Sequence, residues 1–197
     1  MELELGMDTQ CRKNREGDEK MDFWIQASQP RFTSLFDEED YNLSTAIETA
    51  FHMMSENAIM VWKTIHIPLC YKYDISYMIE DILNILQNLR NRSQGELSVH
   101  WSSDTFANVW ELKWDAEDVV INSEWGSVVG HTEEMLKLKG PVVISKESFA
   151  NEWKRVLKNV IEGLKLSGYS EGKLPGMADL VAEYNIIKKD GILYESE

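Results

Sequence analysis

Residues 96–125 read ELSVHWSSDTFANVWELKWDAEDVVINSEW, and this stretch decides the fold of the chain. It contains three apolar runs: Leu97-Val99-Trp101, Trp110-Leu112-Trp114 and Val119-Val120-Ile121. In the first two runs every second residue is apolar, which places those side chains on one face of a strand. The polar breaks Ser-Ser-Asp and Asp-Ala-Glu-Asp are typical of turns. The stretch therefore predicts three antiparallel strands in a meander.

The two faces of this meander differ in chemistry. Four of the seven tryptophans of the chain lie in residues 96–125, together with seven acidic residues and a single base, Lys113. In the middle run the alternation turns Glu111 and Lys113 away from the tryptophans. We expect one face to be a tryptophan-rich core and the other to be an acidic surface.

Amphipathic helices are expected on both sides of the meander in the sequence. Apolar residues recur at helical spacing over residues 44–56, 75–90 and 146–165. Asn42 or Ser44 can cap the first helix, Asp74 the second and Ser145 the third. Shorter β-rich segments occur at residues 22–28, 58–67 and 141–144. The predicted fold class is α+β, with an antiparallel β-meander packed against amphipathic helices in a single domain.

The chain divides by composition into three parts. Residues 1–20 are polar and without period, and we expect a disordered N-terminal tail. Residues 21–168 form the predicted α+β domain. Residues 169–197 begin with glycines and a proline and end in a short helical pattern, so we expect a loosely packed C-terminal helical appendage.

Composition excludes several classes of partner. The 197 residues carry a formal net charge of −14, which opposes direct binding to nucleic acid or to an anionic membrane. No segment reaches the roughly 18 apolar residues of a membrane span, and the N-terminus lacks the apolar core of a secretory signal. Cys11 and Cys70 could form one disulfide, but we expect a cytoplasmic protein with reduced cysteines.

Motifs for catalysis and for cofactors are absent from the sequence. Neither of the glycine-rich phosphate-binding motifs occurs, and the four histidines form no HExxH or HxH pattern. Asp115, Glu117 and Asp118 lack the spacing and the central glycine of a calcium loop. Cys70 with a histidine distant in sequence could in principle form a nucleophile–base pair. A lone cysteine beside a strand is, however, more often a small buried apolar side chain. We therefore expect no enzyme activity, no metal and no cofactor.

A resemblance bears on function. The segments KYDISYMIEDILNIL, VWELKWDAEDVVINSEWGSVVG and VVISKESFANEWKRVLKNVIEGL span residues 72–164. Their arrangement resembles bacterial immunity proteins of polymorphic or contact-dependent toxin systems. The resemblance implies a cytoplasmic, non-enzymatic antitoxin that neutralises a cognate toxin domain. It transfers no binding residue, because immunity families differ in fold and in the surface that they use.

Charge and expected exposure supply the candidate partner-binding residues. The meander and residues 32–62 each carry a net charge of −6, so a basic toxin domain, such as a nuclease, is the expected partner. Trp125 precedes a glycine and is expected to be an exposed anchor. The candidate residues are Asp115, Glu117, Asp118, Glu124 and Trp125, extended by the loop Asp37, Glu38, Glu39 and Asp40. Two alternatives are a small-ligand protein or enzyme with a tryptophan-lined pocket, and an acidic adaptor domain.

Overall fold

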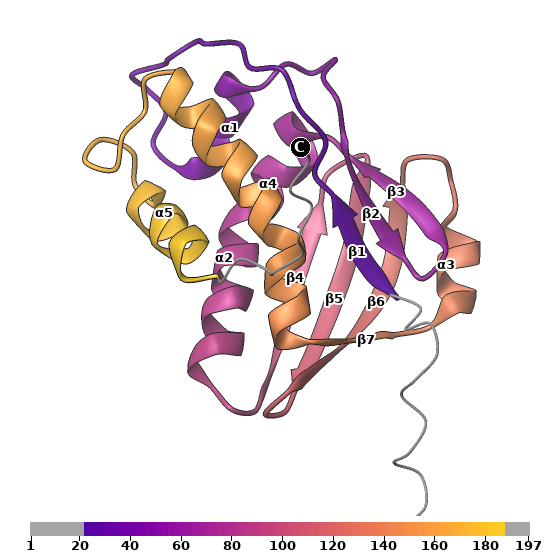
Figure 1. The fold of residues 1–197 in the computed structure, drawn as a ribbon. Coiled ribbons are helices and arrows are strands. Elements are labelled where there is room, and N and C mark those ends of the chain that lie inside the picture. The colour runs from indigo at the N-terminus through magenta and orange to yellow at the C-terminus, as the bar shows by residue number, and fades with distance from the viewer. Residues whose placement is uncertain (1–21, 188–197) are drawn as a thin grey trace, which may run out of the picture.

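The structure, a computed structural model, describes residues 22–187 (Figure 1). The expected tail at residues 1–20, Cys11 and the last ten residues of the expected appendage lie outside that range. Within it the strands are β1 (Phe23–Gln26), β2 (Ala58–Trp62), β3 (Ile65–Leu69), β4 (Gly95–Ser102), β5 (Phe106–Trp114), β6 (Asp118–Val128) and β7 (Val142–Ser145). The helices are α1 (Leu43–Ala50), α2 (Ser76–Asn91), α3 (Glu133–Lys139), α4 (Lys146–Leu166) and α5 (Met177–Ile186), with a π-helical turn at Tyr71–Ile75.

The predicted meander is confirmed. Strands β4, β5 and β6 pair in order and antiparallel, and β7 adds a fourth strand beside β6. Trp110, Leu112 and Trp114 are buried, and Glu111 and Lys113 are exposed, as the alternation predicts. The mixed α+β fold class is confirmed as well.

The buried face of this sheet is covered by helices and by β1. Trp101 of β4 donates its indole N–H to the Asp81 carboxylate of α2 (2.9 Å). The Trp110 ring lies 6.0 Å from Phe23 of β1, and Phe23 in turn stacks on Phe149 of α4. Figure 1 shows α4 lying across the four-stranded sheet. The centre of the core is therefore an aromatic cluster in which sheet, helix and β1 meet.

A second antiparallel sheet has the order β1-β2-β3. Pro68 lies in β3, at the edge of this sheet, where its missing N–H is tolerated. The other edge is β1, and the Ile25 N–H there donates to the Glu152 carboxylate of α4 (2.6 Å). Helix α4 thus supplies a side-chain acceptor where a further strand would otherwise pair.

Two helix predictions need correction. We predicted a helix over residues 44–56, but α1 ends at Ala50 because Phe51 leaves the helix to pair with Phe32 and to stack on Tyr71. Met54, one of the apolar residues within the predicted helix 44–56, is 78% exposed. We also predicted Asp74 as the N-cap of α2, whereas it lies inside the preceding π-helical turn and is buried.

The C-terminal segment packs more closely than an appendage would. Met177 and Leu180 of α5 are fully buried, as is Leu174 before them, and α5 contacts both α2 and α4. Arg90 of α2 forms an ion pair with the buried Glu183 carboxylate of α5 (2.5 Å). The described part of this segment therefore belongs to the core of the domain.

Candidate functional site

The outer face of the β4–β7 sheet is exposed along its length. Its acidic side chains are Glu96, Glu111 and Glu124, one from each of β4, β5 and β6 and all exposed, together with the half-buried Asp118 at the start of β6. The nearest base is Lys113, whose ammonium lies 3.9 Å from the Glu96 carboxylate. Both side chains of that pair are more than two-thirds exposed, so solvent screens it and it neutralises little of the surface. We call Glu96, Glu111, Glu124 and the adjoining turn the acidic sheet face.

The turn between β5 and β6 extends this surface at one end. The Asp115 carboxylate accepts the backbone N–H groups of Glu117 and Asp118, each at 3.0 Å. These hydrogen bonds, that from Asp118 first, lower the pKa of Asp115 below its ordinary value. The Glu117 carbonyl accepts the N–H of Lys146, which ties the turn to the start of α4. Asp115 is thus a structural residue of the turn, while the exposed Glu117 side chain is available to a partner.

Apolar side chains interrupt the acids on the same face. Val109 of β5 pairs with Glu124, Val120 of β6 pairs with Lys113, and Val143 of β7 pairs with Val120. Val143 is 55% exposed, and the other two are half-buried. The acidic sheet face therefore offers small apolar patches that a partner could desolvate.

Trp125 is not on this surface, which corrects the prediction of an exposed anchor. It is 5% exposed, and its ring makes edge contacts with Trp62 (5.1 Å) and Phe106 (6.3 Å). Trp125 follows Glu124 in β6, and successive side chains of a strand point to opposite faces. Because Glu124 points outward, Trp125 belongs to the core.

The loop Asp37–Asp40 lies far from the acidic sheet face. Its Asp37 N–H donates to the Tyr169 hydroxyl (3.1 Å), which in turn donates to the Asp40 carboxylate. Burial, followed by this bond to Asp40, raises the pKa of Tyr169 to about 12. Tyr169 follows the end of α4, whereas the Glu117 turn touches its start. A helix of 21 residues spans about 30 Å, so Asp37, Glu38, Glu39 and Asp40 do not extend the face at which Asp115, Glu117, Asp118 and Glu124 lie.

A buried polar cluster centred on Asp74 was not predicted. The Asp74 carboxylate is 1% exposed and accepts the Cys70 N–H (2.7 Å) and the hydroxyls of Ser103 (2.5 Å) and Thr105 (2.6 Å). These contacts join the start of α2 to the turn between β4 and β5. The four histidines are all exposed, and none of them is a hydrogen-bond partner of Asp74 within residues 22–187. The three hydrogen bonds satisfy the buried carboxylate and hold the start of α2 against the β4–β5 turn.

Other candidate chemistry is sparse in residues 22–187. No group of three or more His, Cys, Asp or Glu residues there could hold a metal ion. No helix of the same range is both long and apolar enough to cross a membrane. The four meander tryptophans are all buried in the core. Trp24 borders a cleft beside α4.

Comparison with known proteins adds no assignment. No family model matches the chain, and neither the curated proteins nor the solved structures contain a significant match. The fold and the candidate surface therefore define the chain as a mixed α+β domain with an acidic sheet face.

Proposed function

We propose that the protein is a non-enzymatic inhibitor of the immunity type, which binds a basic toxin domain through the acidic sheet face. The observation that carries the proposal is a sheet face left open by the helices, on which exposed carboxylates outnumber bases. A sheet face is rigid before binding, so little conformational entropy is lost when a partner docks on it. The expected partner is a nuclease domain, whose cationic substrate groove such a surface would cover.

The two kinds of side chain on this face would act at different stages of binding. Glu111, Glu117 and Glu124 would steer the encounter with a basic surface, because long-range attraction raises the association rate. Val109, Val120 and Val143 would then be desolvated at the centre of the contact. This assignment replaces Trp125, which is buried, as the apolar component of the interface.

The experiment compares two variants of equal net charge. The sheet-face variant carries Glu111→Lys, Glu117→Lys and Glu124→Lys, three exposed positions whose side chains form no hydrogen bond within residues 22–187. Asp115 is left intact because it holds the turn. The control variant carries Glu38→Lys, Glu39→Lys and Glu171→Lys, which lie at the other end of α4 and change the net charge by the same amount.

Wild-type and variant proteins are used to capture partners from lysate of the native cells, and captured proteins are identified by mass spectrometry. Each captured protein is then expressed alone and together with each variant. We expect a basic protein that is toxic alone, that wild type and the control variant bind and neutralise, and that the sheet-face variant does not. A captured partner without toxicity would favour the adaptor alternative. Equal protection by both variants would show that the acidic sheet face is not the binding surface.

A further inference from the structure

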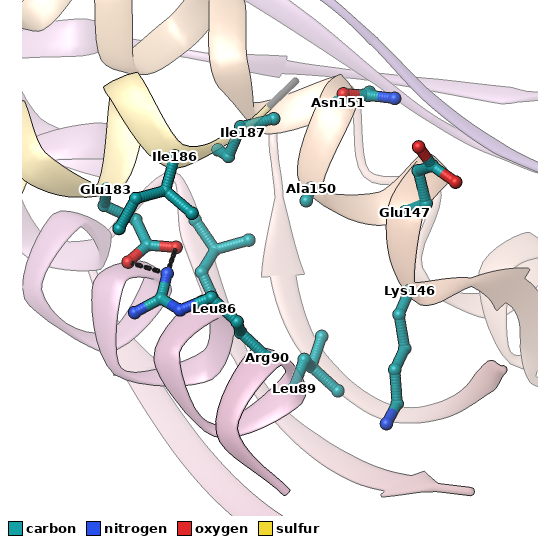
Figure 2. A pocket seen from close by; sticks show the side chains of 10 residues that line it. All are labelled: Leu86, Leu89, Arg90, Lys146, Glu147, Ala150, Asn151, Glu183, Ile186 and Ile187. Carbon is teal, nitrogen blue, oxygen red and sulfur yellow. Dashed lines mark hydrogen bonds and ion pairs between the residues drawn. The ribbon is translucent and has the colours of Figure 1, made fainter. Parts of the chain in front are cut away.

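An apolar cleft lies between α2, α4 and α5, on a different side of the domain from the acidic sheet face. Its volume is about 260 Å³, and its aliphatic walls are Leu86, Leu89, Ala150, Ile186 and Ile187 (Figure 2). Leu86, Leu89 and Ile187 are buried, whereas Ile186 is 51% exposed and forms part of the rim. An apolar cavity of roughly 150 Å³ is large enough to bind benzene in a well-studied protein, so this cleft can hold a molecule of at least that size.

The charged groups around the cleft already have partners or point elsewhere. Arg90 Nη1 lies 2.5 Å from both carboxylate oxygens of Glu183. The Lys146 ammonium donates to the carbonyl oxygens of Arg92 (3.0 Å) and Ser93 (3.2 Å). Figure 2 shows the Lys146 and Glu147 side chains extending away from the aliphatic walls. A charged ligand would therefore lose its hydration without gaining a counter-charge, which is unfavourable.

We propose that this cleft binds a small uncharged aliphatic molecule, such as a straight chain of six to eight carbons ending in a hydroxyl. The chain would lie against the aliphatic walls, and the polar end would remain in the water at the open side of the cleft. The bound molecule would contact α2, α4 and α5 together. Because α5 is the last element of the described domain, ligand binding would hold it to the core and raise the melting temperature.

The experiment uses the full chain and three probes of the same length: 1-hexanol, hexanoate and hexylammonium. Binding is measured by titration calorimetry and by nuclear Overhauser effects between ligand protons and the methyl groups of Ile186 and Ile187. The expected dissociation constant of 1-hexanol is roughly millimolar, from burial of about six methylene-sized groups. The two charged probes should bind at least about tenfold more weakly.

A variant locates the binding site. Ala150→Phe places a ring in the cleft, and Ala182→Phe places the same ring on the exposed side of α5 as a control. We expect Ala150→Phe to abolish 1-hexanol binding and Ala182→Phe to retain it. Absence of 1-hexanol binding to the wild type, equal binding of the charged probes, or unchanged binding in Ala150→Phe would each overturn the proposal. Should Ala150→Phe fail to fold, probe selectivity and the contacts to Ile186 and Ile187 still decide the question.

Discussion

Replacement of Asp74 should destabilise the domain more than its position at the start of a helix would suggest. Its carboxylate is buried and accepts three hydrogen bonds, from a backbone N–H and from two hydroxyls. Asp74→Ala leaves those three donors without their acceptor. A buried donor that loses its acceptor costs about 1–3 kcal/mol, so the loss of one acceptor for three donors should cost about 3–5 kcal/mol of unfolding free energy. For a protein of this size, that corresponds to a fall of roughly 6–20 °C in melting temperature.

The Asp74→Asn variant tests whether the loss of stability comes from the three hydrogen bonds or from any substitution at this position. An asparagine can turn its carbonyl oxygen toward the Cys70 N–H, which can only donate. Its amide group then faces Ser103 and Thr105, whose hydroxyls can rotate to accept. We therefore expect Asp74→Asn to cost about 1–2 kcal/mol, less than the alanine variant.

The assay is urea unfolding followed by tryptophan fluorescence, with Asp104→Ala as the matched control. Asp104 is an exposed acid in the turn that Ser103 and Thr105 flank, and its replacement should change stability by less than about 0.5 kcal/mol. If Asp74→Ala unfolds at the same urea concentration as wild type, the buried network does not contribute as argued. Equal losses for the alanine and asparagine variants would refute the role assigned to the two hydroxyls.

Three other predictions test the core, a partly buried acid and the absence of a metal. Trp153→Ala should cost about 3–5 kcal/mol in a denaturation experiment, because Trp153 is fully buried on α4; an unchanged melt would contradict its place in the core. Burial raises the pKa of Asp81, and the hydrogen bond from the Trp101 N–H offsets part of this rise. The folded state therefore favours the protonated carboxyl group of Asp81. Its contribution to the free energy of unfolding is lost as the pH rises through the pKa of the folded state. Relative to wild type, the Asp81→Asn variant should therefore be more stable at pH 7 than at a pH near the ordinary pKa of 3.8. The opposite trend in the unfolding midpoints of the two proteins would refute this. A chelator should leave the melting temperature of the full chain unchanged, and a large fall would reveal a metal site.

Period-two patterning predicted much of the fold. The alternation in residues 96–125 correctly gave three antiparallel strands and the buried set Trp110, Leu112 and Trp114. Ser145 caps α4 as expected, through the Ser148 N–H. These features depend on neighbours in sequence, which a single sequence displays directly.

The same patterning contained the signal that would have placed Trp125. Ile121 is buried, and Trp125 lies four residues further along β6, so both have the same parity and face inward. The prediction of an exposed Trp125 depends instead on the glycine that follows it, Gly126. In the structure an added Cβ at Gly126 would lie 2.8 Å from the Ala107 carbonyl, so the glycine reflects close strand packing.

Features that depend on distant parts of the chain could not be predicted. The hydrogen bonds to Asp74 come from Ser103 and Thr105, about thirty residues away in the sequence. No local sequence pattern predicts that contact. The separation of the two acidic segments follows from where α4 begins and ends in the fold. The packing of α5 depends on α2 and α4, including the Arg90–Glu183 pair, while its own apolar pattern is weak.

The most direct test of the central claim is the association rate of the captured basic partner at two ionic strengths. Wild type, the sheet-face variant and the control variant defined above are compared by stopped-flow fluorescence. We predict that the sheet-face variant associates about tenfold more slowly than wild type at low salt, with a smaller dependence on salt. The control variant should stay close to wild type, because its substitutions lie at the opposite end of α4. Equal rates and equal salt dependence for wild type and the sheet-face variant would contradict binding through the acidic sheet face.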